Sequence, residues 1–307
     1  MDFNIINKIN DSGKNIRIMF DFSNLTYRCA FVMVTELRMK QFKDFGLFKH
    51  KVLNDIIKFS SRFIDPEIVI CHDEKDSERH YWRHEFFPEY KSNRKKQESP
   101  IPKDILYEQF NIIKDEIEEN LPWKTISMNA VEADDIIGVI ATEYSDDTIN
   151  VIVSPDKDFQ QLLSSENVYQ FCPMKYAWID CQDPEYYLFE HVIRGDSSDG
   201  IPNIYSDSDT LAVAGKKQTQ VRKTKINEMW DLYKNSNLAT VAKVFFTEDQ
   251  KKRFVENRKL IDLQKIPKSI RTEIKRIYDG IDVKGSTKKF WSYCNKNNLT
   301  ELSTTVV

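Results

Sequence analysis

The chain has 307 residues, of which 30% are charged and 40% are hydrophobic, and its formal net charge is −3. This length allows a large core, and we expect one larger domain with a smaller one beside it. A charge so close to balance excludes a strongly basic nucleic-acid-binding protein. Any surface that binds nucleic acid must therefore be a local basic patch.

Neither a membrane span nor a secretory signal is expected. No run approaches the roughly 20 apolar residues of a transmembrane helix, and the polar residues 1–11 hold no signal-peptide core. The five cysteines are scattered and form no C-x-x-C pair. They predict reduced thiols in the cytoplasm rather than disulfides or a thiolate zinc site.

The first part of the chain alternates apolar runs with amphipathic stretches. The apolar runs predict strands at residues 16–22, 68–71, 123–128 and 149–153. Helical spacing predicts helices from residue 23, over 51–63, over 103–120 and within the segment VEADDIIGVIATEY. Strands that alternate with helices are typical of a parallel α/β sheet.

A change of pattern follows. Residues 168–171 and 176–179 predict a short hairpin, and from residue 184 the strand signals fade. Helices are expected at about 184–194, 225–234, 247–262, 267–279 and 287–297. We therefore expect an α/β domain over residues 1–183, with a central, mostly parallel sheet flanked by helices, and a smaller all-helical domain over residues 184–307.

Nine carboxylates in five short clusters are the main functional signal: Asp21, Asp73, Glu132/Asp134/Asp135, Asp156/Asp158 and Asp196/Asp199. Asp21, Asp73 and Asp156 fall at the carboxyl ends of predicted strands, where sites lie in parallel sheets. Gathered together, the acids would repel one another unless cations neutralised them. Oxygen-only ligands favour Mg²⁺ or Mn²⁺. The clusters predict a metal-dependent enzyme that acts on phosphodiesters.

Each cluster also has an ordinary structural explanation. Glu132 stands three residues after Asn129, the spacing of a helix capping box. Asp156 and Asp158 could form a turn and a helix cap, and residues 196–200 an ordinary polar turn. Only the five clusters together favour a metal site. An EF-hand, a dinucleotide fingerprint and a P-loop are excluded because their glycine and acid spacings do not occur.

Two basic segments predict contacts with nucleic acid. In residues 79–96 we expect Pro88 to start a helix that presents Tyr90, Lys91 and Arg94 on one side, which suits a single strand. Trp82, Phe86 and Phe87 are expected to pack. The second segment could clamp a duplex backbone, although a basic run is commonly a solvated face. Its cations are Lys216, Lys217, Arg222, Lys223 and Lys225. A zinc site at His80/His84 is not expected, because no third ligand is in register.

Six segments, in this order, resemble motifs of the flap endonuclease family of 5′-nucleases: IMFDFSN, VICHDEKD, YKSNR, VEADDIIG, SPDKDFQQL and RGDSSDGIPN. The resemblance covers nearly the whole chain and implies two metal-binding sets of acids. The first set is Asp21, Asp73, Glu132 and Asp134, and the second is Asp156, Asp158, Asp196 and Asp199. Asp134 would be shared between the ions, with Asp135 supporting. The resemblance also implies a helical arch near residues 77–98, with Arg83, Tyr90, Lys91 and Arg94 near the scissile phosphate. Arg83, Lys91 and Asp134 are the expected catalytic residues.

The function implied is a Mg²⁺-dependent 5′→3′ exonuclease and flap endonuclease with two ions, for which Mn²⁺ could substitute. Its substrates would be RNA–DNA hybrid and duplex DNA with free 5′ ends or flaps, and it would remove RNA primers in replication. The G-x-G-x-K-T core of the wider family is missing after Ile201. This leaves that family's potassium site unsupported and favours the phage branch, and thus the cytoplasm of a host cell.

A monomer without membrane contact is expected, and a sliding clamp and a single-strand binding protein are candidate partners. Two alternatives stay open. The chain could be a PIN-like endoribonuclease, or a structure-specific DNA-binding protein that uses metals without catalysis.

Overall fold

A computed structural model describes residues 3–35, 45–78, 80–93 and 103–303. Its centre is a six-stranded sheet in the order β3-β2-β1-β4-β5-β6, in which only β5 and β6 pair antiparallel. The strands are β1 (Asn15–Asp21), β2 (Glu67–Cys71), β3 (Lys124–Ile126), β4 (Thr148–Val153), β5 (Val168–Cys172) and β6 (Ala177–Ile179). The expected mostly parallel α/β sheet is confirmed.

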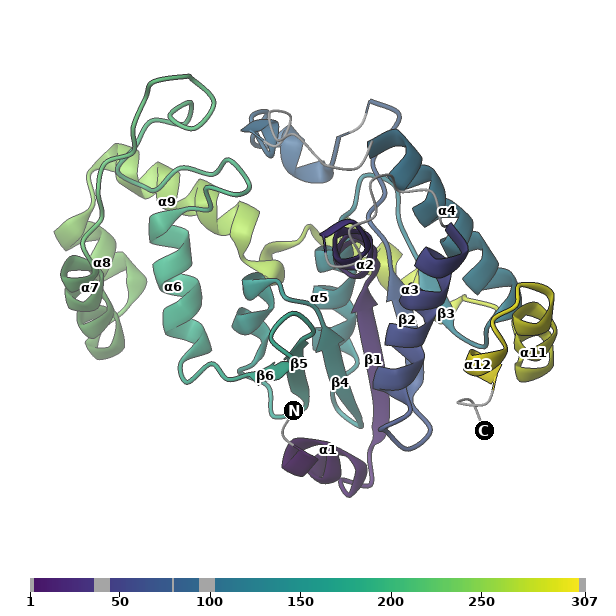
Figure 1. Cartoon of the computed structure of the whole chain (residues 1–307). Coiled ribbons are helices and arrows are strands. Elements are labelled where there is room, and N and C mark those ends of the chain that lie inside the picture. Colours follow the sequence, from purple (N-terminus) through teal and green to yellow (C-terminus); the bar gives the residue numbers. More distant parts are fainter. Residues whose placement is uncertain (1–2, 36–44, 79, 94–102, 304–307) are drawn as a thin grey trace.

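Helices flank this sheet and continue beyond it (Figure 1). The α-helices are α1 (Phe3–Asn10), α2 (Phe22–Thr35), α3 (Phe45–Ser60), α4 (Lys103–Asn120), α5 (Ala133–Glu143), α6 (Pro184–Arg194), α7 (Lys223–Asn235), α8 (Leu238–Phe245), α9 (Glu248–Ile261), α10 (Lys268–Asp279), α11 (Thr287–Lys296) and α12 (Thr300–Ser303). Short 3₁₀ helices are η1 (Trp82–Glu85), η3 (Lys157–Leu162) and η4 (Leu263–Lys265). The sequence patterns did not predict α1, α8 and α12.

Alternation along β1 divides the core into two layers. Ile18 and Phe20 face a cluster built with α1 to α4, α11 and α12, whereas Met19 faces a second cluster built with α5, η3, η4 and α10. Successive side chains of a strand point to opposite faces, so a strand that is apolar throughout must be covered on both sides. The sheet is therefore a middle layer between helices.

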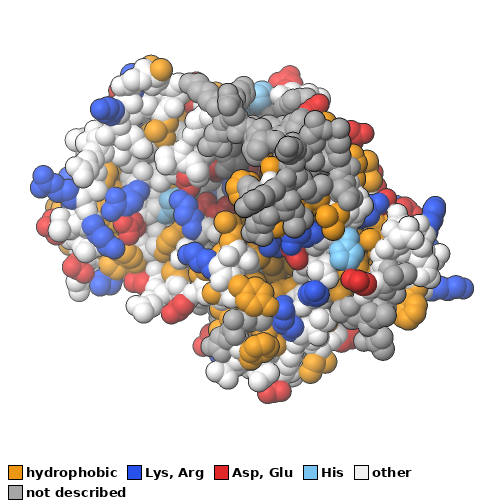
Figure 2. Space-filling view, viewed as in Figure 1, with side chains coloured by type: hydrophobic (Ala, Val, Ile, Leu, Met, Phe, Trp, Pro, Cys, Tyr) orange, Lys and Arg blue, Asp and Glu red, His pale blue; other side chains and the backbone are white. Residues whose placement is uncertain are grey.

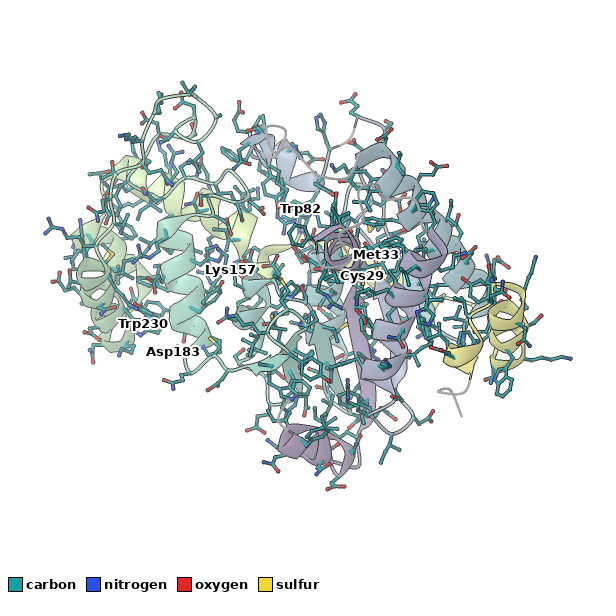
Figure 3. All side chains as sticks on the ribbon, in the orientation of Figure 1. Cys29, Met33, Trp82, Lys157, Asp183 and Trp230 are labelled. Carbon is teal, nitrogen blue, oxygen red and sulfur yellow. The ribbon has the colours of Figure 1, made fainter. Side chains whose placement is uncertain are left out.

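A third core cluster joins α6, α7, α8 and α9 at the left of Figure 1. Figure 3 shows Trp230 among these helices and Trp82 well apart from it, above the sheet. From η4 onward the chain returns to the sheet, because Ile274 joins the second cluster and Phe290 joins the first. The helices expected over residues 184–307 therefore pack in two places.

All five cysteines lie in the described ranges and are free. Cys29 and Met33 lie on α2 in the first cluster (Figure 3), and burial raises the pKa of the Cys29 thiol to about 12. Cys29 is therefore a packing residue. No helix in the described part of the chain is long and apolar enough to cross a membrane.

Candidate metal centre and nucleic-acid interface

The site begins where the order of the sheet reverses. β2 and β3 lie on one side of β1, and β4 to β6 lie on the other. Connections diverge at such a point and leave room beyond the carboxyl ends of the strands. Asp21 ends β1, and Ser154 follows β4. The Ser154 hydroxyl donates to Asp21 (3.0 Å) and accepts from the Asp156 amide (3.1 Å), which joins the two strand ends.

The third acidic cluster stands at the start of α5. Glu132 is the N-cap residue, its amide donates to the Asp135 carboxylate (3.3 Å), and the Ala133 amide donates to Asp73 (2.8 Å). Acids at this end of a helix are favoured by the helix dipole. Placing the cap at Asn129 was therefore wrong by three residues. Glu132 therefore begins the helix and also lies in the acidic centre, so its structural role does not exclude a functional one.

The remaining acids come from η3 and from the turn after α6. Asp134, Asp158, Asp196 and Asp199 line one small pocket, which is closed by apolar side chains of α9 and η4. Asp156 caps η3 by accepting the Asp158 amide (2.9 Å). The fold therefore brings together clusters that lie far apart in the sequence.

Three acids, the compensated acids, each pair with an arginine or a lysine at 3.2 Å or less: Glu132, Asp135 and Asp196. Arg83 donates to Glu132 (2.8 Å) and to Asp135 (2.7 Å). Burial alone would raise the pKa of Glu132, but Lys91 and Arg83 outweigh burial and lower it to about 2. At Asp196, burial raises the pKa, but hydrogen bonds with His191 and Ser198 lower it by more, so the pKa lies below its ordinary value.

Four acids, the uncompensated acids, behave in the opposite way: Asp21, Asp134, Asp156 and Asp158. Among the described residues, none of the four forms an ion pair with lysine or arginine. Burial, with Asp73 adding to it, raises the pKa of Asp21 to about 7. Burial and then Asp156 raise the pKa of Asp134, and burial raises that of Asp158 to about 7. Buried carboxylates that repel one another and lack a lysine or arginine partner would be stabilised in their charged form by bound cations.

The first basic segment differs from its expected form. Residues 88–91 are turns and Lys91 has a φ of 56°, so Pro88 does not start the expected helix. Tyr90 is only 4% exposed, and its hydroxyl donates to Glu132 (2.8 Å) and Asp199 (2.9 Å). Its ring is therefore packed and not presented to solvent for stacking. Arg83 is also buried, and Arg94 lies outside the described residues.

Lys91 stands at the acidic centre. Its ammonium pairs with Glu132 and lies 3.6 Å from Asp199, and its amide donates to the Asp199 carbonyl (2.7 Å). Trp82 is buried and donates to Asp135 (2.8 Å), which agrees with a packing role. Residues 82–91 therefore supply cation and hydroxyl donors to the acids.

The second basic segment lies on the other side of the site. Lys217, Arg222 and Lys223 are exposed, whereas Lys225 is half-buried with its ammonium 4.6 Å from the centre of the Tyr205 ring. Lys216 is exposed but pairs with Asp209 at 2.7 Å. Figure 2 shows Lys and Arg side chains gathered over the region of α6 to α9. The segment therefore offers fewer uncommitted cations than its sequence suggests.

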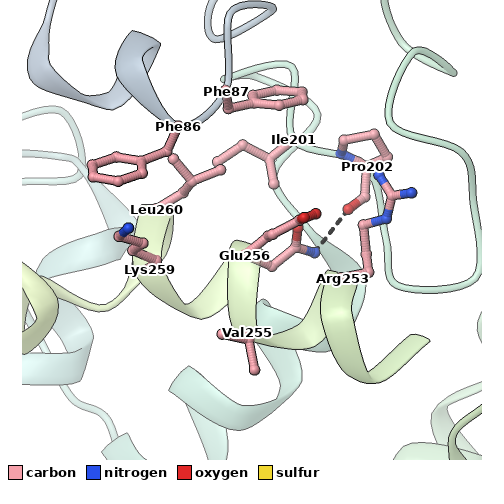
Figure 4. A pocket seen from close by; sticks show the side chains of 10 residues that line it. Phe86, Phe87, Ile201, Pro202, Arg253, Val255, Glu256, Lys259 and Leu260 are labelled. Atoms are coloured by element: carbon pink, nitrogen blue, oxygen red, sulfur yellow. Dashed lines mark hydrogen bonds between the residues drawn. The ribbon is translucent and has the colours of Figure 1, made fainter. Parts of the chain in front are cut away.

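A larger pocket of about 260 Å³ adjoins the acidic one (Figure 4). Ile201 and Leu260 line both pockets and separate them. Beneath this wall the buried Asn257 donates to the carbonyl oxygens of Val192 (3.0 Å) and Pro202 (2.8 Å). α9 thereby fixes the turn that carries Asp196 and Asp199.

Sequence reasoning missed three residues of this region: Ser154, His191 and Asn257. The one available signal for Asn257 is its position in the apolar stripe of α9, between Phe254 and Leu260. His191 is buried on α6, and its ring lies between Asp158 and Asp196. The expected oxygen-only centre therefore includes an imidazole.

Acids gathered at the switch point of a mostly parallel sheet are an arrangement that suits metal-dependent chemistry on phosphodiesters. The chain belongs to the 5′-3′ exonuclease family, whose N-terminal resolvase-like domain matches residues 17–186. The C-terminal domain of T4 RNase H matches residues 182–307. The resemblance to the 5′-nucleases is thus confirmed, and the chain is a nuclease by homology.

Individual proteins agree with this family. The chain is 29% identical to ribonuclease H of Enterobacteria phage T4 over 298 residues, which cover 94% of each. It is 26% identical to a 5′-3′ exonuclease of Mycoplasmopsis pulmonis over 71% of this chain and 72% of that protein. The structure matches a bacteriophage T5 flap endonuclease complex with DNA and metal ions, with a TM-score of 0.57 and 19% identity, over 92% and 99% of the two chains. This last match shows a shared fold.

Proposed function

We propose that the chain is a Mg²⁺-dependent 5′→3′ exonuclease and flap endonuclease. Its substrates would be RNA–DNA hybrid and duplex DNA, and it would remove RNA primers during replication. The observation that carries this proposal is the set of uncompensated acids at the switch point of the sheet. Similarity to a ribonuclease H and to a flap endonuclease bound to DNA and metal ions supports the choice of substrate.

Two divalent ions fit this acidic centre. The uncompensated acids would be direct ligands, with Asp134 shared, and Asp73 and Asp199 would contribute at the edges. Ions held there supply an activated water and neutralise the charge that develops on the leaving oxygen. The compensated acids would orient this set, because chain donors already occupy their oxygens. Mn²⁺ would substitute for Mg²⁺.

The cations of the arch base would have different roles. Lys91 lies at the acidic centre and is partly accessible, so we assign it to the scissile phosphate. Arg83 is enclosed by Glu132, Asp135 and the Leu260 carbonyl oxygen. It would keep both carboxylates charged and in place without contacting substrate. Arg83 is thus a positioning residue in this proposal, as is Tyr90.

The acid set is tested by cleavage of a 5′-labelled RNA–DNA hybrid and a 5′-flap duplex, with Mg²⁺ varied. Asp134→Asn and Asp199→Asn are expected to lose activity by at least about a hundredfold, since each removes charge that the ions need. Asp231→Asn, at an exposed position of α7, is the matched control. Full Mg²⁺-dependent cleavage by both site variants would refute the assignment.

The same substrates separate the two alternatives. Efficient cutting of a closed circular strand would favour a PIN-like endoribonuclease, because a circle has no 5′ end. Flap binding without product in either Mg²⁺ or Mn²⁺ would favour a DNA-binding protein. A sliding clamp and a single-strand binding protein would then be tested as partners of the substrate-bound enzyme.

Lys217, Arg222 and Lys223 would hold the duplex backbone. Each phosphate contact adds about 0.9 to the slope of log affinity against log salt. Changing all three to alanine should therefore weaken binding and reduce that slope by about 2 to 3. Lys216→Ala should change the slope less, because Asp209 already neutralises this lysine. Equal effects of the two variants in salt titrations would exclude a specific clamp.

A further inference from the structure

His191 lies inside the acidic centre. It projects from α6, is 6% exposed, and its ring lies between Asp158 and Asp196 of the second set of acids. Nε2 is 3.1 Å from an Asp196 oxygen, and Nδ1 is 3.5 Å from Asp158 Oδ1. Among the described residues, neither His191 Nδ1 nor Asp158 Oδ1 has a hydrogen-bond partner, although both atoms are buried. Two atoms that could both bind a cation, a ring nitrogen and a carboxylate oxygen, therefore face each other.

Asp196 is suited to orient this ring. Its Oδ1 accepts from the Ser198 amide (2.7 Å) and hydroxyl (2.5 Å), and its Oδ2 faces Lys157 (3.2 Å) as well as His191. With Asp196 ionised, the Nε2–H donates to it and the Nδ1 lone pair points toward Asp158. A carboxylate that accepts from the far nitrogen is the usual way in which a metal-binding histidine is held.

The spacing fits shared coordination. Metal–nitrogen and metal–oxygen distances are both about 2.1 Å, so two adjacent ligands of one ion lie about 3.0–3.4 Å apart. The observed 3.5 Å between His191 Nδ1 and Asp158 Oδ1 needs almost no rearrangement. The three side chains also offer ligand atoms within 4.8 Å of one another.

We propose that His191 Nδ1 and Asp158 Oδ1 are direct ligands of one divalent ion, with Asp196 orienting the histidine. An imidazole ligand favours a first-row transition ion such as Mn²⁺ over Mg²⁺. This half of the centre is then a mixed nitrogen–oxygen site with its own metal preference. The inference rests on the proposed metal-dependent function and adds a ligand that the acid motifs do not contain.

Pulsed electron paramagnetic resonance of Mn²⁺ bound to the full chain tests this proposal. We expect nitrogen modulation from a coordinated imidazole in the unaltered protein, and selective ¹⁵N labelling of histidine should change its frequency. His191→Gln should abolish the modulation and weaken Mn²⁺ binding by at least about tenfold, while Mg²⁺ binding changes much less. His50→Gln, at a half-buried histidine of α3, is the matched control and should leave both unchanged.

The outcomes separate this inference from the proposed function. Bound Mn²⁺ without nitrogen modulation, or modulation that survives in His191→Gln, overturns the histidine ligand and leaves the nuclease assignment standing. Failure of Mn²⁺ and Mg²⁺ to bind the unaltered protein overturns the proposed metal centre itself. If the variant does not fold, the isotope-labelling result still shows whether any imidazole coordinates the ion, and its absence overturns the histidine ligand.

Discussion

The charge state of each carboxylate at the sheet edge is set by the partners that the fold gives it. Glu132 and Asp134 are two residues apart at the start of α5, yet their pKa values move in opposite directions. Burial opposes both charges, but Lys91 and Arg83 reverse its effect at Glu132, whereas Asp156 and Asp21 add to it at Asp134. Glu132 is the N-cap residue with an extended backbone (φ −90°, ψ 155°), whereas Asp134 lies in the first turn of α5, so the two side chains meet different neighbours.

This contrast predicts opposite effects on stability in the absence of metal. Glu132→Gln should lower the free energy of unfolding by about 3 kcal/mol, because it removes the buried charge that pairs with Lys91 and one of the two that pair with Arg83. Asp134→Asn should raise the free energy of unfolding, because it removes repulsion from Asp21 and Asp156. Urea unfolding with EDTA at pH 7 measures both. Destabilisation of similar size in the two variants would contradict the division into compensated and uncompensated acids.

Residue types alone predicted which acids gather but not how they divide. Arg83 reaches Glu132 from 49 residues away in the sequence, and Tyr90 reaches Asp199 from 109 residues away. No local spacing encodes these pairs. For the same reason the sequence favoured an exposed, stacking Tyr90, whereas the ring is buried in the core of α6 to α9.

At the scale of elements, the turn after α6 depends on close packing. Gly195 has a φ of 66°, and a Cβ there would lie 2.4 Å from the carbonyl oxygens of Ile201 and Pro202. Asn257 of α9 holds the Pro202 carbonyl from the other side. The backbone carrying Asp196 and Asp199 therefore has no room to shift.

Gly195→Ala and Gly215→Ala form a matched pair. Gly215 also has a positive φ, 87°, but nothing lies within 4 Å of a Cβ there. A positive φ costs an alanine at least about 1–2 kcal/mol at either position, and Gly195, with a ψ of −175°, adopts a backbone that is essentially limited to glycine. Gly195→Ala should lose more than this, and divalent-ion binding should weaken only in this variant. Thermal unfolding and calorimetric titration check both effects, and equal losses at the two positions would argue against the packed turn.

Strands were more predictable than the connections. β1 and β4 are buried on both faces, so their sequences are nearly continuous apolar runs, and such runs are a clear signal of a central strand. The helix expected from Pro88 fails because Lys91 adopts a positive φ, where the Asp199 carbonyl accepts its amide. That contact comes from a distant turn. A short element such as α8 depends on packing against α7 and lacks a long periodic signal.

At the scale of the whole molecule, the acidic centre forms only when separate layers assemble. The sheet supplies Asp21, the cap of η3 supplies Asp156, the turn after α6 supplies Asp196 and Asp199, and α9 and η4 close the pocket. Assembly without cations places like charges together at a cost in folding free energy. The stability of the whole chain should therefore depend on pH and on metal together.

The sign of this dependence follows from Asp21 and Asp158, whose pKa values rise from an ordinary 3.8 to about 7 on folding. Between these values the folded chain holds protons at both acids that the unfolded chain has released, so their contribution to stability falls as pH rises from 4 to 7. His72, whose pKa burial lowers to about 3, contributes with the opposite sign and is common to the variants below. Melting in EDTA should show this fall, and Asp21→Asn with Asp158→Asn should flatten it. Mg²⁺ at a hundred times its dissociation constant should restore about 2.7 kcal/mol. Because binding displaces the same protons, its gain should grow toward pH 8. The same pH dependence in the unaltered protein and in the double variant would show that these acids do not repel one another in the metal-free fold.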